Sequence, residues 1–151
     1  MPRPPDAPTD ELSIGYLMHW GARLLRRLAD RRLKTFGMSW SHLPVINALD
    51  ANESLSQKAL AEIAAIEQPT MVTTLARMER DGVIGRRPDP KDGRSVLFFL
   101  TAATRKKLPA IRRAVSEVNE DALEGLPKSE RARFRAQLEA MIRAMDGKTR
   151  A

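Results

Sequence analysis

The chain has 151 residues and a hydrophobic content of 42%, enough for one domain with helical extensions and a buried core. Its formal net charge of +7 favours anionic partners. The absence of cysteine excludes disulfides, thiol catalysis and cysteine-ligated metals, and the two histidines have no carboxylate cluster near them in the sequence. We therefore expect no metal site and no cofactor.

A membrane partner is not expected either. The sequence has no apolar run of about 18 residues, which a membrane-spanning helix needs. Its first residues lack the apolar segment of a signal peptide. These patterns predict a soluble, cytoplasmic protein.

The first predicted elements are an arm and a basic helix. Four prolines among the first eight residues predict a flexible arm over residues 1–8. Leucines at helical spacing, interleaved with arginines, predict a long helix over 9–36, which Gly37 ends. Ser39 or Ser41 is expected to cap a short second helix, which tolerates Pro44 only in its first turn.

Two further short helices follow in tandem. A brief strand around Leu55 precedes Ser56, which is expected to cap a third helix over 57–64. The fourth helix is expected to run from Gln68 to Arg80, because Pro69 is favoured in a first helical turn. Two short helices joined by a tight turn are typical of a helix-turn-helix.

A basic β-hairpin is expected over residues 82–101. Val83-Ile84 opens one strand and residues 96–100 form the other, with two prolines and the turn signal Asp92-Gly93 between them. Residues 68–107 hold nine lysines and arginines against four acids, so the positive charge is concentrated here. Such a ribbon suits a phosphate-lined groove better than an apolar partner, which makes a nucleic acid the first candidate.

Two more helices are expected after the hairpin. Thr101 is predicted to cap the fifth, and Pro109 predicts a kink near 105–109 or a restart of the helix. The sixth starts at Leu126-Pro127, carries a strong apolar stripe and ends at Gly147. The inward stripe of the fifth helix is expected to consist of Ile111, Val115, Val118 and Ala122.

The apolar stripes of the first, fifth and sixth helices exceed what a small winged domain can cover. Burial of these stripes between two copies of the chain would remove them from water. A two-fold homodimer is therefore expected.

The fourth helix divides into two faces at helical spacing. Met71, Leu75 and Met78 are expected to be buried, while Thr70, Thr73, Thr74 and Arg77 are expected to be exposed. Hydroxyl, methyl and guanidinium groups are suited to phosphates and base edges. A merely solvated face is the alternative, although threonine is a poor helix former.

The hairpin turn brings an arginine close to an acid. Arg94 follows Asp92-Gly93, where a hairpin can lay a side chain into the minor groove, and Asp92 can hold the guanidinium in a bidentate pair. The alternative is that Asp92-Gly93 only makes the turn and that Arg94 is a solvated charge.

The order of these elements resembles that of the multiple antibiotic resistance regulator (MarR) family of bacterial winged-helix repressors over nearly the whole chain. The most specific matches are LARMERDG at 75–82, RRPDP at 86–90, DGR at 92–94 and Leu100-Thr101. The resemblance implies a mainly α fold with a small β-hairpin wing. It places a winged helix-turn-helix DNA-binding domain at 39–101 and a helical dimerisation region at 9–36 and 102–147.

The same resemblance implies a homodimer on a palindromic operator, with Arg94 in the minor groove and Asp92 orienting it. Thr73 stands where many relatives have arginine, a departure that removes a phosphate or base contact and changes operator preference. We therefore predict a sequence-specific regulator of double-stranded DNA, acting as a repressor. The candidate DNA contacts are Ser56, Gln57, Gln68, Pro69, Thr70, Thr73, Thr74, Arg77, Arg86, Lys91, Asp92 and Arg94.

Members of this family often release DNA when a small aromatic anion binds beside the dimerisation helices. His19, Trp20, Trp40 and His42 are the candidate contacts for such an effector here. The alternatives are core or dimer packing for the tryptophans and a hydrogen-bonded or surface role for the histidines.

Two other classes of function are weighed against this prediction. An enzyme is not expected, because a nucleophile elbow, a P-loop, a dinucleotide glycine motif and a metal cluster are missing. A winged helix used mainly for protein–protein contacts is the alternative, but it would predict an apolar fourth helix rather than a polar one followed by a basic hairpin.

Overall fold

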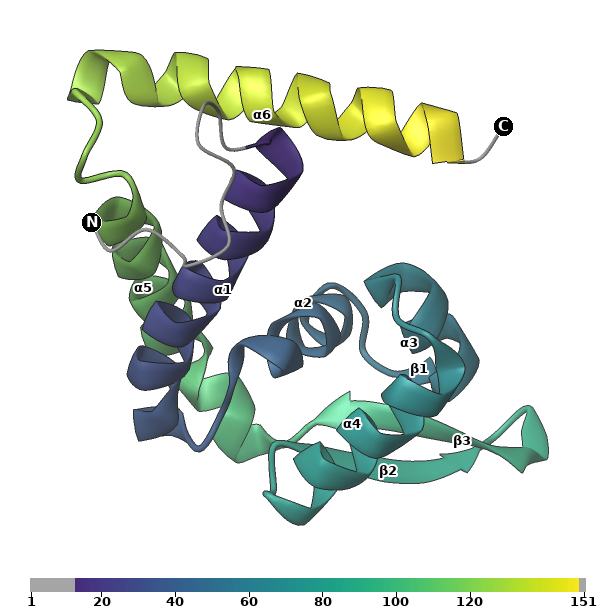
Figure 1. Cartoon of the computed structure of the whole chain (residues 1–151). Coiled ribbons are helices and arrows are strands. Elements are labelled where there is room, and N and C mark those ends of the chain that lie inside the picture. Colours follow the sequence, from purple (N-terminus) through teal and green to yellow (C-terminus); the bar gives the residue numbers. More distant parts are fainter. Residues whose placement is uncertain (1–12, 150–151) are drawn as a thin grey trace. The chain divides into compact units, whose positions relative to one another are not determined.

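The computed structural model describes residues 13–149, which fall into two compact units. Residues up to Val115 belong to the first unit and residues from Ser116 onward to the second, so the division falls within one helix. The mainly helical chain with a small antiparallel sheet (Figure 1) confirms the predicted fold class. The arm predicted over residues 1–8 lies outside the described residues.

The elements follow one another in the predicted order. The helices are α1 (Ile14–Leu33), the short 3-10 helices η1 (Lys34–Phe36) and η2 (Trp40–His42), α2 (Leu43–Ala51), α3 (Gln57–Ala64), α4 (Gln68–Arg80), α5 (Ala102–Ala122) and α6 (Lys128–Thr149). The strands are β1 (Leu55–Ser56), β2 (Ile84–Asp89) and β3 (Asp92–Leu100).

Local sequence signals set both ends of α1 and its continuation. The hydroxyl of Ser13 accepts a hydrogen bond from the N–H of Tyr16 at 3.2 Å, as an N-cap does. Gly37 ends η1 in the left-handed conformation with φ of 71°, and the N–H of Met38 donates to the carbonyl of Leu33 at 3.2 Å. The predicted end at Gly37 is therefore confirmed.

The helix-turn-helix is held by caps at both ends of α3. The hydroxyl of Ser56 accepts a hydrogen bond from the N–H of Ala59 at 3.2 Å, which confirms its predicted role as N-cap. Ala65 ends α3 in the left-handed conformation with φ of 51°, and the turn leads into α4 at Gln68 as predicted. Side chains of α2, α3 and α4 form much of the core, including Val45, Ile46, Leu49, Leu60, Met71, Leu75 and Met78.

The sheet has the strand order β1-β3-β2, with all neighbours antiparallel. Leu55 pairs with Phe98, and Ile84 pairs with Leu100. Phe98, Ile84 and Leu100 are buried, so this part of the sheet belongs to the core. The β2–β3 hairpin extends beyond α4 (Figure 1), and its pairing becomes irregular at Pro88.

The long helix α5 departs from the prediction in its buried stripe. It continues through Pro109, so the helix does not restart there. Its buried apolar residues are Leu108, Ile111, Ala114 and Val118, whereas Val115 is half-buried and Ala122 is exposed. The predicted stripe continued from Ile111 to Val115, four residues further on, but the helix buries Ala114, three residues further on. Both spacings lie on the same face of a helix.

The second unit contains α6, which has no buried residue. Its apolar residues are exposed at Phe134, Leu138, Ile142 and Met145. The helix continues through Gly147 to Thr149, so the predicted end at Gly147 is wrong. A glycine costs a helix only about 1 kcal/mol, which does not by itself end it.

Candidate nucleic-acid interface

The fourth helix presents two different faces. Met71, Leu75 and Met78 are buried, as the spacing predicts. Thr70, Thr73 and Arg77 are exposed, whereas Thr74 is half-buried. Thr74 is therefore less accessible than the other predicted contacts on this helix.

Contacts with the hairpin fix the position of α4. The N–H of Val83 donates to the carbonyl of Met78 at 2.9 Å, so the residue just before β2 is bonded to the last turn of α4. Arg86 on β2 forms an ion pair with Glu79 on α4, with 2.9 Å between Nε and Oε1. A backbone hydrogen bond and an ion pair thus join α4 to the β2–β3 hairpin.

The tip of the hairpin is shaped by two aspartates that bind backbone. The N–H of Lys91 donates to Asp89 Oδ1 at 2.9 Å, and the N–H of Arg94 donates to Asp92 Oδ1 at 3.0 Å. The predicted bidentate pair between Asp92 and the guanidinium of Arg94 is not formed, because the Asp92 carboxylate binds the backbone of Arg94. Asp92 therefore fixes the shape of the tip.

The Arg94 side chain is exposed and has no hydrogen-bond or ion-pair partner among the described residues. Lys91 is also exposed at this tip. A hairpin tip with two unengaged cations is suited to a phosphate backbone or a narrow minor groove.

The two adjacent arginines of β2 serve opposite faces of the sheet. Arg86 faces Glu79, whereas Arg87 donates to Glu53 Oε1 at 3.3 Å and to Ser54 Oγ at 3.1 Å. The Arg87 guanidinium also lies over the ring of Phe99, 5.7 Å from the ring centroid. Arg87 therefore supports the hairpin. This role was not predicted, because alternation along a strand places Arg86 and Arg87 on opposite faces but does not show which face meets α4.

Polar side chains also meet where α3 and α4 begin. The side-chain amide of Gln57 donates to Gln68 Oε1 at 3.2 Å, which joins the first residues of the two helices. Ser56 uses its hydroxyl as the cap of α3. Ser56, Gln57 and Gln68 thus have structural partners, as Arg86 and Asp92 do. The side chains of Thr70 and Arg77 form no hydrogen bond or ion pair among the described residues.

The candidate effector residues lie in two groups. Trp20 on α1 is next to Tyr16, with ring centroids 6.2 Å apart, and His19 is exposed beside it. Trp40 and His42 form η2, at the junction between α1 and α2. Both of these residues make structural contacts there.

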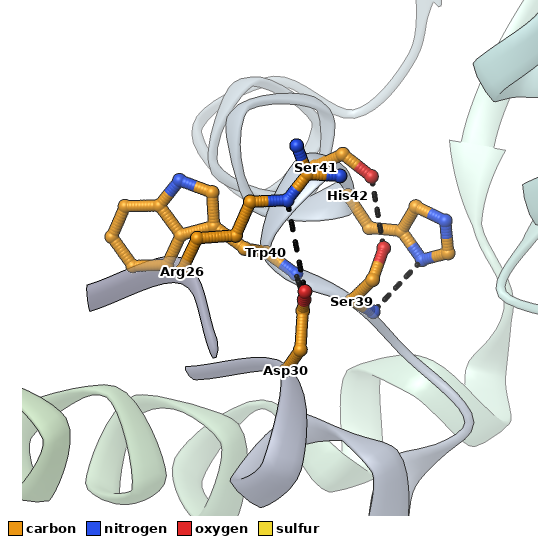
Figure 2. A network of polar contacts seen from close by, with 6 residues as sticks. All are labelled: Arg26, Asp30, Ser39, Trp40, Ser41 and His42. Carbon is orange, nitrogen blue, oxygen red and sulfur yellow. Dashed lines mark hydrogen bonds and ion pairs between the residues drawn. The ribbon is translucent and has the colours of Figure 1, made fainter. Parts of the chain in front are cut away.

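Asp30 on α1 organises this junction (Figure 2). Its Oδ1 accepts a hydrogen bond from the backbone N–H of Trp40 at 2.7 Å, and its Oδ2 lies 3.7 Å from Arg26 Nε. The N–H of Ser39 donates to His42 Nδ1 at 3.4 Å. This role of Asp30 was not predicted, because no local pattern connects it with a residue ten positions further along the chain.

His42 is the buried titratable group of this junction. It is 3% exposed, and its Nε2 atom has no hydrogen-bond partner within residues 13–149. Because Ser39 donates to Nδ1, the proton of the neutral ring is on Nε2. Burial lowers the pKa of His42, and the charge of Arg77 lowers it further, while Asp81 and Asp30 oppose the shift.

The described residues offer no sign of two other kinds of site. None of their helices is both long and apolar enough to cross a membrane. No group of three or more His, Cys, Asp or Glu side chains among them could hold a metal ion.

A helix-turn-helix joined to a basic hairpin defines a winged helix-turn-helix protein. Residues 36–95 match the model of the MarR family. Mb0904, an HTH-type transcriptional regulator of Mycobacterium bovis, is 30% identical over 124 residues, which cover 82% of this chain and 86% of that protein. The chain belongs to the MarR family, which confirms the predicted family, and it is a DNA-binding transcriptional regulator rather than an enzyme.

Solved structures share the fold over most of their length. The S. aureus MepR–DNA complex has a TM-score of 0.77 and 24% identity, with 89% of this chain and 99% of MepR covered. The MarR family protein RV2887 of Mycobacterium tuberculosis, in complex with salicylic acid, has a TM-score of 0.68 and 25% identity, with 87% and 98% covered.

Proposed function

We propose that the protein binds a pseudo-palindromic operator in double-stranded DNA as a homodimer, represses transcription there, and is released by a small aromatic anion. The observation that carries the proposal is the combination, within one unit, of an exposed polar face on α4 and a hairpin tip with unengaged cations. Each supplies a different part of DNA recognition, since base edges specify and phosphates position.

The groups on α4 and on the hairpin suit these two tasks. Thr70 and Arg77 are exposed and uncommitted within the described residues, so they can contact base edges or phosphates in a major groove. Arg94 and Lys91 can contact the flanking backbone or the minor groove. Arg86 keeps 61% of its side chain exposed beside Glu79 and can add a phosphate contact. The MepR crystal with DNA supports this use of the fold.

Exposed apolar residues on the terminal helices support a homodimer. Ile14 and Leu17 on α1 are 64% and 42% exposed, and α6 has the exposed stripe that includes Leu138 and Ile142. Apolar stripes of this length on a helix are normally covered by another chain or element. In a two-fold dimer the two recognition helices would meet major grooves about 34 Å apart, which predicts half-sites with centres about 10 base pairs apart.

The effector proposal rests on the α1–α2 junction. The backbone of Trp40 binds Asp30, whose carboxylate also pairs with Arg26, so an aromatic residue and a cationic side chain occur at one junction. An aromatic anion needs both. The complex of RV2887 with salicylic acid supports this class of ligand.

One experiment tests the DNA and dimer proposals together. The full-length protein should select a common sequence from a random pool of double-stranded DNA, and hydroxyl-radical footprinting should show two protected half-sites. Sedimentation of the complex should give two protein chains per site. A single asymmetric half-site, or one chain per site, would contradict the dimer, and no selected sequence would favour a winged helix used for protein contacts.

The effector is tested separately, with salicylate as the first probe. It should quench tryptophan fluorescence and release the selected DNA at the same concentrations, while benzyl alcohol, which lacks the charge, should do neither.

Repression is tested with a reporter gene placed behind the selected site, which should be expressed less when the protein is present. Activation of the reporter would contradict repression.

A further inference from the structure

The outermost ridge of α4 carries small or apolar groups rather than hydrogen-bond donors. Pro69, Thr73 and Ala76 lie one helical turn apart, opposite the buried side chains, and all three are exposed. Val72 stands beside this ridge and is 49% exposed. Threonine and valine are poor helix formers, so a need for helicity does not explain Thr73 and Val72 on a solvated face.

The hydroxyl of Thr73 is already used inside the helix. Its Oγ1 donates to the carbonyl of Pro69 at 3.1 Å. A hydroxyl has a single hydrogen to donate, so Thr73 has none left for a phosphate oxygen or for the acceptor atoms of a base edge. The oxygen can still accept a hydrogen bond, but thymine offers no donor on its major-groove edge, so the methyl group is the group of Thr73 that suits thymine.

The arginines near the ridge do not change its character. Arg80 lies on the same ridge one turn further on, and its Nε is paired with Asp81 Oδ1 at 3.1 Å. Arg77 is on the flank of the ridge, where it can reach a phosphate or a neighbouring base edge. The middle of the ridge thus offers van der Waals contact, and its flank offers charge.

We propose that Thr73 is a specificity-determining residue that recognises the C5-methyl group of thymine in the major groove, with Val72 adding a second apolar contact. The inference rests on the proposed function, since it requires α4 to enter the groove of an operator. Of the four bases, only thymine presents a methyl group on its major-groove edge. The contact therefore selects thymine over cytosine without any hydrogen bond from Thr73.

The expected size of the effect follows from the burial of one methyl group. Such a group contributes about 0.8 kcal/mol, which corresponds to a change of about fourfold in affinity. Each half-site carries one such contact, so a symmetric loss in both half-sites would multiply to roughly fifteenfold.

The experiment starts from the operator that the full-length protein selects. Each thymine of a half-site is replaced in turn by deoxyuridine, which removes the methyl group and leaves every hydrogen-bonding atom in place. We expect the parent protein to bind about fourfold more weakly when the thymine facing Thr73 is replaced, on the scale of one buried methyl group. Replacement of thymines outside the footprint should have no effect.

Two variants separate the methyl group from the hydroxyl. Thr73→Val keeps a methyl group and removes the hydroxyl, so it should bind the operator as the parent does and still prefer thymine to uracil. Thr73→Ser keeps the hydroxyl and removes the methyl group. It should bind roughly fifteenfold more weakly, because both half-sites of the dimer lose a methyl contact, and it should no longer distinguish the two bases.

Thr35 provides matched control variants. Its hydroxyl donates to the carbonyl of Arg32 at 2.9 Å, which is the same kind of local bond at a site away from α4. Thr35→Val and Thr35→Ser should leave DNA binding unchanged. Thermal unfolding of all four variants shows how much of any loss at position 73 comes from the stability of the helix.

The outcomes are distinct. Weak binding by Thr73→Val together with normal binding by Thr73→Ser would show that DNA uses the hydroxyl, and the proposal would be wrong. Equal affinity for every thymine and uracil operator would also overturn it, while leaving sequence-specific binding intact. If the parent protein selects no sequence at all, the result contradicts the proposed function, on which the inference about Thr73 rests.

Discussion

The ring of Phe99 lies so close to Gly85 on the neighbouring strand that a Cβ atom on residue 85 would be 2.7 Å from the Cζ atom of Phe99. The two residues are register partners in the β2–β3 hairpin. The guanidinium of Arg87 covers the same ring. The base of the wing is thus built around one aromatic ring, with a residue that lacks a side chain on one side of it and a cation on the other.

Gly85→Ala should destabilise the protein by about 1–3 kcal/mol, because the added methyl group forces the Phe99 ring out of its place. Denaturant unfolding of the full chain measures the change. Gly93→Ala is the matched control, since a Cβ atom at Gly93 in the same hairpin meets no atom within 4 Å. Equal stability of the two variants would mean that the ring moves aside without cost.

Arg94→Ala should weaken operator binding by about 1–3 kcal/mol and reduce the slope of log affinity against log salt by about one unit. The side chain is exposed and uncommitted within the described residues, so the free energy of unfolding should hardly change. Fluorescence anisotropy at several salt concentrations measures both effects.

Arg87→Ala tests the specificity of that result on the same hairpin. Arg87 is engaged by Glu53, Ser54 and Phe99, so its removal should lower stability and leave the salt slope nearly unchanged. A change of slope for Arg87→Ala and none for Arg94→Ala would reverse the roles assigned to the two arginines.

His42 should make the stability of the protein depend on pH. Its pKa is lowered in the folded state, so the unfolded chain binds more protons below the ordinary value of 6.5. The contribution of His42 to the free energy of unfolding should therefore be fully present above pH 6.5 and should be lost as the pH drops through the folded-state pKa. Unfolding by urea at a series of pH values measures this slope.

His42→Asn keeps an acceptor for the N–H of Ser39 and removes the titrating group, so it should flatten the dependence on pH whatever its absolute stability. His19→Gln, at an exposed position, is the control and should keep the slope of the parent. An unchanged slope in His42→Asn would assign the dependence to other groups.

Leu138→Glu should convert the proposed dimer to monomers without unfolding α6. Leu138 is 37% exposed, so the new charge is tolerated in a single chain but is buried without a partner in an apolar interface. Sedimentation velocity at micromolar concentration distinguishes the two states. Ala136→Glu places the same charge on the opposite side of the helix and should leave the dimer intact; dissociation of both variants would argue against an interface along this stripe.

The sequence predicts best those features that depend on a residue and its close neighbours. Ser56 caps α3, Gly37 ends the first helical segment, and α4 begins at Gln68 next to a proline, each as predicted. Caps and left-handed turns are decided within one helical turn of the residue, so a local pattern contains the information needed.

Partners fixed by tertiary packing were predicted less well. The contact of the Asp92 carboxylate with the N–H of Arg94 is local, yet the sequence does not show whether the carboxylate binds this N–H or the guanidinium. The pairings of Arg86 with Glu79 and of Arg87 with Phe99 depend on which face of the sheet meets α4. Strand register decides that, and no single strand sequence reveals it.

The left-handed conformation of Ala65 determines how the recognition helix is presented. A residue with a Cβ atom has only a small allowed region there, whereas glycine would have a wide one. The turn between α3 and α4 therefore has little angular freedom. If α4 enters a groove as proposed, its pitch there is set when the chain folds, so duplexes that bend or twist easily should bind more tightly than stiff ones that present the same contacted bases.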